Sequence, residues 1–190
     1  MRIIGGSLRG RVLKAPKGTA TRPTTDRVRE SIFNIIAPFI QGAYFLDLFA
    51  GSGAIGIEAL SRGAKKVVFV EKSKRTASGI RANVQMFGLE DRAEVLVGDV
   101  WSHVPKLMDF DLVFADPPFD CGFVGPLLDL VETSGILKDQ GFCIIEHSLK
   151  ESPPQALSGL SLIRQRRYGS IEVSVFRKEE KQNESGNMSR

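Results

Sequence analysis

One apolar stretch of this chain runs directly into an acid, two prolines and an aromatic residue. The segment Phe110–Ala115 is followed by Asp116-Pro117-Pro118-Phe119. Consecutive prolines fix the backbone in an extended turn, so that Asp116 and a nearby backbone carbonyl can accept both hydrogens of an exocyclic amine. Such an amine on a purine is a poor nucleophile, and fixing its hydrogens pulls the nitrogen toward tetrahedral geometry. The tetrapeptide therefore predicts alkylation of a base amine, with Phe119 stacked on the base. The alternative is a stiff structural turn with a core phenylalanine.

A glycine-rich segment lies earlier in the chain, between a predicted strand and a predicted helix. Gly51, Gly53 and Gly56 fit the pattern G-x-G-x-x-G. Glycines there let the backbone turn sharply and approach a ligand closely. Glu71 follows Gly51 by twenty residues, at the end of the next predicted strand, where a carboxylate can accept hydrogen bonds from both ribose hydroxyls. The pattern predicts a nucleoside-type ligand and does not by itself separate NAD from S-adenosylmethionine.

Two acids favour S-adenosylmethionine over a dinucleotide. Asp47 lies near the end of the first predicted strand, where an acid suits the cationic amino-acid end of S-adenosylmethionine and would repel a pyrophosphate. Asp99 closes the third strand, where it could accept from the adenine amino group. The structural alternatives are a loop-bracing role for Asp47 and a helix cap for Asp99. The expected cofactor-binding residues are Asp47, Phe49, Gly51, Ser52, Gly53, Glu71, Lys72, Asp99, Val100, and Thr24 and Thr25 ahead of a helix that could lie over the cofactor.

Alternating strand and helix signals place these groups at the carboxyl ends of adjacent strands. The predicted strands cover residues 44–49, 66–70, 93–97, 112–115 and 141–146, and the predicted helices cover 27–36, 54–62, 73–87, 104–108 and 126–134. Apolar strands separated by helices are typical of a parallel sheet covered on both faces. Residues 160–163 and 171–176 flank a turn at Gly169 and predict a closing antiparallel pair. We therefore expect a doubly wound α/β sheet of seven strands, with Pro38 ending the first helix.

The beginning of the chain is strongly basic. Residues 1–29 carry eight basic side chains and one acid, a net charge of +7 against +4 for the whole chain. Residues 1–20 predict a small β-hairpin, and the charge predicts a polyanionic partner, with a solvated surface arm as the alternative. The candidate phosphate-contacting residues are Arg2, Arg9, Arg11, Lys14, Arg22, Arg27, Arg29 and Arg166, with Arg164 and Arg167 as second candidates. Arg22, Arg27 and Arg29 could instead pair with Asp26 or Glu30.

Composition agrees with a soluble globular protein. Of 190 residues, 42% are hydrophobic and 25% charged, and no apolar run approaches a membrane span. We expect one domain over residues 1–177, including a basic arm over 1–24, and a disordered polar tail over 178–190. The chain opens without a signal peptide, and Cys121 and Cys143 show neither metal nor disulfide spacing, which predicts a cytoplasmic protein without a metal. His103 and His147 receive no predicted role.

Several of these motifs resemble one family. The tetrapeptide at residue 116 matches the (Asp/Asn/Ser)-Pro-Pro-(aromatic) signature of amino-directed nucleic-acid methyltransferases. Met1–Gly6, Arg22–Glu30, Phe33-Asn34 and Asp47–Gly56 resemble the RsmD-type family, in order, over about residues 1–177. The resemblance implies a class I methyltransferase fold of Rossmann-like type, with S-adenosylmethionine as the methyl donor. It also implies methylation of N2 of a guanine in bacterial 16S ribosomal RNA. We expect a monomeric enzyme whose partner is ribosomal RNA within a small-subunit particle, with free RNA as the open alternative.

Other functions stay open at this point. The tetrapeptide chemistry serves adenine N6 as well as guanine N2, but the motifs leave little chain for a separate DNA-recognition region. The glycine pattern alone would also fit an NAD-dependent oxidoreductase, and a non-catalytic RNA-binding module could retain the fold. We expect direct in-line transfer, without a covalent intermediate on Cys121.

Overall fold

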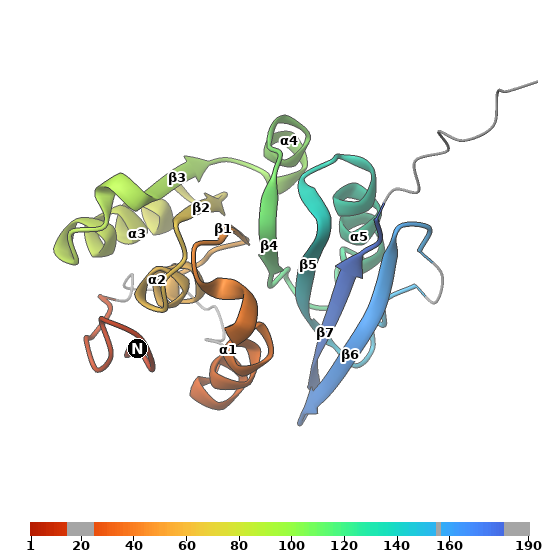
Figure 1. Ribbon diagram of the computed structural model, residues 1–190, viewed down its shortest axis with the longest axis horizontal. Helices are drawn as coiled ribbons and strands as arrows, with labels where there is room; N and C mark the ends of the chain where they lie inside the picture. Colours follow the sequence, from red (N-terminus) through yellow and green to blue (C-terminus); the bar gives the residue numbers. More distant parts are fainter. Residues whose placement is uncertain (15–24, 155–156, 181–190) are drawn as a thin grey trace, which may run out of the picture.

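The computed structural model describes residues 1–14, 25–154 and 157–180 (Figure 1). Its centre is a seven-stranded sheet with the strand order β3-β2-β1-β4-β5-β7-β6. Neighbouring strands among β1 to β5 are parallel, whereas β7 pairs antiparallel with both β5 and β6. This confirms the predicted parallel sheet with a closing hairpin. The strands are β1 (Tyr44–Leu48), β2 (Lys66–Glu71), β3 (Ala93–Val97), β4 (Phe110–Ala115), β5 (Leu137–Ser148), β6 (Leu160–Tyr168) and β7 (Ile171–Lys178).

Helices cover both faces of this sheet, as the apolar strands require. The helices are α1 (Asp26–Ile40), α2 (Ala54–Ser61), α3 (Lys74–Met86), α4 (Val100–His103) and α5 (Val124–Thr133), with the short 3-10 helices η1 (Glu90–Arg92) and η2 (Val104–Lys106). One core cluster joins α1, α2 and α3 to one face, and a second joins α4, η2 and α5 to the other. Adjacent residues of β1 divide between the two, since Phe45 belongs to the first cluster and Leu46 to the second. None of the helices in the described ranges is both long and apolar enough to cross a membrane.

Two helices differ from the sequence prediction. Pro38 lies inside α1 instead of ending it, because the missing N–H affects only the last turn and buried Ile40 holds that turn in the core. The helix expected over 104–108 starts earlier, at Val100. Asp99 caps it by accepting from the Trp101 N–H at 3.1 Å, and the chain then tightens into η2.

The three C-terminal strands are longer than expected. β5 begins at Leu137, which pairs with Phe110 of β4. The register between the two strands then shifts before Leu112 of β4 pairs with Phe142 of β5. β7 continues to Lys178, whose ammonium is largely buried and donates to the Leu137 carbonyl at 2.6 Å. Pairing with β7 also extends β6, which continues to Tyr168. Cross-strand pairing, rather than local hydrophobicity, sets these ends.

The basic arm is docked on α2. A bridge joins Arg2 to Val12, as the predicted hairpin requires; its expected continuation beyond residue 14 lies outside the described residues. The N–H groups of Ile4 and Gly5 donate to the buried carboxylate of Glu58 at 2.9 and 2.8 Å. Backbone donors of the arm are thereby satisfied by a side chain of the helix that follows the glycine loop.

Arg29 does not face solvent, contrary to its expected role as a phosphate contact. Its side chain is buried and donates to the Arg2 carbonyl. It pairs with Asp26 at 2.9 Å and lies 3.6 Å from Glu58. The pairing alternative is therefore the observed one, and Arg29 fastens the arm to α1. A buried cation without such partners would be strongly destabilising.

Candidate functional site

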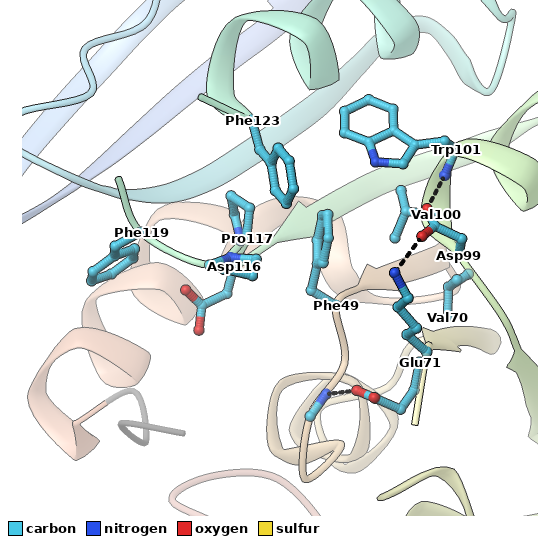
Figure 2. A pocket seen from close by; sticks show the side chains of 13 residues that line it. Phe49, Val70, Glu71, Asp99, Val100, Trp101, Asp116, Pro117, Phe119 and Phe123 are labelled. Carbon is cyan, nitrogen blue, oxygen red and sulfur yellow. Dashed lines mark hydrogen bonds and ion pairs between the residues drawn. The ribbon is translucent and has the colours of Figure 1, made fainter. Parts of the chain in front are cut away.

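A cavity of about 510 Å³ opens at the carboxyl ends of the parallel strands (Figure 2). It lies where the strand order reverses between β1 and β4, the place at which doubly wound sheets bind ligands. Its lining comes from the ends of β1, β2, β3 and β4 and from the start of α5. The lining residues are Phe49, Gly51, Val70, Glu71, Lys72, Asp99, Val100, Trp101, Asp116, Pro117, Pro118, Phe119 and Phe123.

The loop after β1 turns sharply beneath this cavity. Phe49, Gly51 and Gly53 have φ angles of 56°, 54° and 74°, in the left-handed region that favours glycine. Gly56 serves packing instead of ligand contact, because a Cβ there would lie 2.2 Å from Cε1 of Phe69. The glycines thus shape the loop at its start and let α2 approach β2 farther along.

Asp47 lies under the loop and not among the residues that line the cavity. Its side chain is buried, and Oδ2 accepts from the Gly56 N–H at 2.9 Å. Burial raises the pKa of Asp47 well above its ordinary value, although the Gly56 hydrogen bond acts in the opposite direction. This geometry is the loop-bracing alternative and offers no direct contact with the amino-acid end of a ligand.

Glu71 ties the end of β2 to the glycine loop. Its two carboxylate oxygens accept from the Gly51 N–H at 2.9 Å and from the Ser73 N–H at 2.7 Å. Each oxygen keeps a second lone pair that can accept from a hydroxyl in the cavity. The carboxylate is thereby oriented before any ligand arrives, at the position predicted for ribose binding.

Asp99 combines a helix cap with a place in the cavity wall. One oxygen accepts from the Trp101 N–H, and the other pairs with the Lys72 ammonium at 3.0 Å. The Lys72 side chain, and after it the Trp101 N–H, hold the pKa of Asp99 below its ordinary value. The carboxylate is therefore ionised at neutral pH, which suits it to accept from an amino group.

Three aromatic side chains form an apolar wall next to these acids. The rings of Phe49 and Phe123 are stacked, with centroids 6.3 Å apart, and Trp101 meets Phe123 edge-on at 5.7 Å. An apolar wall of aromatic rings suits a flat heterocycle. Trp101 and Phe123 were not predicted as site residues. Only their positions, just after Asp99 and just after the proline turn, could have indicated them.

The proline turn closes the other end of the cavity. Asp116 directly follows β4 and is partly exposed, Pro117 is buried and Pro118 is exposed. Figure 2 shows Asp116 and Phe119 at one end of the cavity, with Asp99 and Trp101 at the other. Acceptors for an amine and a nucleoside-sized space therefore share one cavity.

Other predicted residues lie elsewhere. Ser52 and Gly53 do not line the cavity within the described part of the chain. Thr25 caps α1 by accepting from the Val28 N–H at 3.4 Å. Thr24 and Arg22 lie outside the described residues.

The cysteine and histidine side chains show no catalytic arrangement. Cys121 is exposed, with Sγ 3.4 Å from the Phe119 carbonyl oxygen. His147 is buried and hydrogen-bonded to the Ser174 hydroxyl at 2.8 Å, which is a structural arrangement. His103 lies 3.3 Å from the Val97 carbonyl oxygen. In the ranges that the structure describes, no three His, Cys, Asp or Glu residues are grouped so as to hold a metal ion.

Comparisons with known proteins agree along nearly the whole chain. The family model described as Conserved hypothetical protein 95 matches residues 1–177. The chain is 38% identical to YlbH of Bacillus subtilis, over 94% of this chain and 99% of that protein. It is 37% identical to ribosomal RNA small subunit methyltransferase D of Escherichia coli K12, over 94% and 90% respectively. The solved structure of yhhF from Escherichia coli is 37% identical and superposes with a TM-score of 0.86, over 94% of this chain and 98% of that one.

Proposed function

Because this chain belongs to the family described as Conserved hypothetical protein 95, the RsmD family, we propose that it methylates small-subunit ribosomal RNA with S-adenosylmethionine as donor. The chain has the class I methyltransferase fold. One observation supports the proposal independently of the family. The Asp116 turn lines the same cavity as Glu71 and Asp99, the two acids that suit a nucleoside. The proposed acceptor atom is N2 of a guanine, as the RsmD-type resemblance implies.

The residues of the cavity fit the proposed donor. Glu71 offers oriented carboxylate oxygens for ribose hydroxyls, and Asp99 offers an ionised carboxylate for the adenine amine. The wall of Phe49, Trp101 and Phe123 suits the adenine ring. When bound, S-adenosylmethionine supplies an electrophilic sulfonium methyl group. Asp47 contributes indirectly, by bracing the loop that forms the floor.

Asp116 and the rigid turn behind it perform the chemical work at the acceptor. The side chain and a backbone carbonyl of the turn accept the two amine hydrogens, which directs the nitrogen lone pair toward the methyl group. Phe119 stacks on the extruded base. Transfer would break the bond between sulfur and methyl as the bond between nitrogen and methyl forms, which leaves a neutral thioether. The methylated amine would then lose one proton, which Asp116, the carboxylate of the turn, can accept. No covalent enzyme intermediate is needed, so Cys121 takes no part.

The choice of nucleic acid follows from the relatives and from the size of the chain. A relative at 37% identity is named for the small ribosomal subunit RNA. The motifs occupy nearly all of the chain, so specificity must come largely from a preformed RNA shape, in which a loop base is cheaper to extrude than a paired one. We propose ribosomal RNA, within a small-subunit particle, as the partner of a monomeric cytoplasmic enzyme. Adenine N6 is the second candidate, because the turn would accept its hydrogens equally well.

Binding of two ligands tests the donor assignment. Titration calorimetry on the purified protein should show binding of S-adenosylhomocysteine and none of NADH, because Glu71 and Asp99 in the cavity wall would repel a pyrophosphate and the Lys72 ammonium is already paired with Asp99. Binding of NADH alone would favour an oxidoreductase. Binding of RNA without methyl transfer from the labelled donor would favour a non-catalytic RNA-binding module.

A further inference from the structure

Four arginines line a second cleft, outside the cavity already described. Arg27 comes from the first turn of α1, and Arg164, Arg166 and Arg167 come from the edge strand β6. The cleft has a volume of about 400 Å³, and no acidic side chain lines it in the described part of the chain. We call this feature the arginine cleft. Two secondary-structure elements far apart in the sequence therefore present like charges to one space.

The arginine cleft is a built feature. The Tyr168 hydroxyl hydrogen-bonds the Ser31 hydroxyl and so joins the end of β6 to α1. Arg167 is oriented by donating from Nε to the Gly169 carbonyl at 3.1 Å. The remaining lining adds an amide, from Asn34, beside the hydroxyls. Side chains of this kind and backbone-fixed guanidinium groups suit phosphate oxygens.

None of the four guanidinium groups has an ion pair within the described ranges of the chain, and only that of Arg167 has a hydrogen bond. Arg27, Arg164 and Arg166 are exposed and have neither an ion pair nor a hydrogen-bond partner among the residues that the structure describes. Elsewhere, by contrast, Arg62 pairs with Glu58 at 2.8 Å. Like charges gathered without counter-charges create a positive potential that attracts a polyanion.

The arginine cleft lies at the same edge of the sheet as the acceptor end of the cavity. β5 ends at Ser148, which is paired in register with Ile171 at the β6–β7 turn. The Ser148 hydroxyl also donates to Asp120, directly after the proline turn, at 2.5 Å. Phe119 and Tyr168 pack against the same core cluster. The acceptor end of the cavity and the arginine cleft therefore lie at the same edge of the sheet, along which an RNA strand can extend from a base stacked on Phe119.

The part of the basic arm around Leu8 and Arg11 occupies a different place, whereas Met1 contacts Ser52 of the glycine loop. Helices that connect parallel strands run antiparallel to those strands. The C-terminal ends of α2 and α3 therefore lie at the edge of the sheet opposite to the cavity. The arm contacts those ends: the Leu8 N–H donates to Ser61, and Arg11 lies over the Phe87 ring at 5.6 Å. Arg11 thus lies away from the acceptor end of the cavity.

From these observations we propose that the arginine cleft binds backbone phosphates of the RNA strand that flank the extruded base. The inference rests on the proposed function for the identity of the strand. Guanidinium forks match phosphate geometry and fix the strand without reading its sequence. The cleft therefore positions the target base over Phe119, and the base is recognised in the cavity.

RNA affinity as a function of salt tests this assignment. Filter binding uses transcribed small-subunit ribosomal RNA and the double variant Arg164→Ala/Arg166→Ala. Loss of two phosphate contacts should reduce the slope of log K against log salt by about 1.4. The affinity of the variant should then be roughly 25-fold weaker than that of the wild type at 0.1 M salt and nearly equal to it at 1 M salt. The matched control is Lys65→Ala/Lys106→Ala, two exposed lysines ahead of the amino ends of β2 and β4, which should retain the wild-type slope. Arg9→Ala/Arg11→Ala should change the slope less than the cleft variant does.

Donor binding separates this inference from the proposed function. S-adenosylhomocysteine affinity should be the same in the cleft variant and the wild type, which shows that the fold and the cavity are intact. A cleft variant with wild-type RNA affinity and slope would overturn the inference even if the wild type methylates RNA. A variant that binds naked RNA normally and loses affinity only for assembled subunits would overturn it in favour of a protein partner. Cleft-dependent RNA binding without methyl transfer by the wild type would support the cleft and remove the proposed function.

Discussion

At the scale of single residues, Asp116 is the group on which the proposed chemistry depends. Replacing it with alanine removes one of the two acceptors for the amine, and the rate of methyl transfer should fall by about 100-fold or more, as when an oxyanion-hole donor is removed. Cys121→Ala should retain most activity, because the exposed thiol has no part in direct transfer. Single-turnover transfer of labelled methyl to ribosomal RNA measures both. Equal losses in the two variants would contradict the assignment.

Asp47 makes a pH-dependent contribution to stability. Its pKa is raised in the folded protein, chiefly by burial, so protonation favours the folded state. The stabilisation is complete below the pKa that Asp47 has in the unfolded chain. It is lost as the pH rises through the raised pKa that Asp47 has in the folded protein. Asp47→Asn keeps an oxygen for the Gly56 N–H without a charge. The variant should therefore gain in thermal unfolding temperature, relative to wild type, as the pH increases, and an unchanging difference would refute this explanation.

Sequence spacing predicted some of these residues and misplaced others. Glu71 and Asp99 were predicted because both end strands, and both line the cavity. Asp47 lies one residue before the end of β1, but adjacent residues of a strand point to opposite faces, and its side chain bonds Gly56 under the loop. Trp101 and Phe123 were missed because an aromatic residue after a strand is equally compatible with the core.

At the scale of elements, the contact between α2 and β2 positions the glycine loop. Gly56→Ala would place a methyl group 2.2 Å from the Phe69 ring, so α2 must move. We expect a loss of about 2 kcal/mol or more in the free energy of unfolding, together with weaker donor binding. Gly125→Ala in α5 is the matched control. Apart from its chain neighbours, a Cβ there meets nothing within 4 Å. The gain from replacing a helical glycine is opposed by the proline that follows it, so the substitution should change the free energy of unfolding by less than about 1 kcal/mol. Chemical denaturation measures both, and equal effects would contradict the packing role.

The elements were predictable to the extent that their signals are local. Parallel strands such as β1 and β2 are short apolar runs between helices, and their positions were predicted within a residue. β5 and β7 were predicted too short because pairing with other strands holds their ends: Leu137 pairs with β4, Ser148 with β7, and Lys178 with β6. The Lys178 ammonium adds a hydrogen bond to the Leu137 carbonyl. A hydrophobic pattern contains no information on such long-range contacts.

At the scale of the whole molecule, the sheet assembles segments that are distant in the chain at one edge. The order β2-β1-β4-β5 brings the glycine loop and the proline turn to neighbouring strands, as the alternating pattern predicted. The basic residues could not be sorted in the same way. Arg29 is buried, and the Arg11 side of the arm lies toward the edge of the sheet opposite to the cavity. Arg27 and Arg166, which are distant in the sequence, line one cleft because the fold brings α1 and β6 together. Composition indicated a polyanionic partner, and three-dimensional structure was needed to indicate where it would bind.

The most direct test of the central proposal is to identify the methylated nucleoside. The protein is incubated with labelled S-adenosylmethionine and small-subunit ribosomal RNA, both free and in assembled subunits, and the RNA is digested to nucleosides. The cavity, with Asp116 and Phe119 at its acceptor end, predicts label on an exocyclic base amine, and the RsmD-type resemblance places it in N2-methylguanosine. Recovery of N6-methyladenosine, or label that enters only duplex DNA, would contradict the guanine assignment.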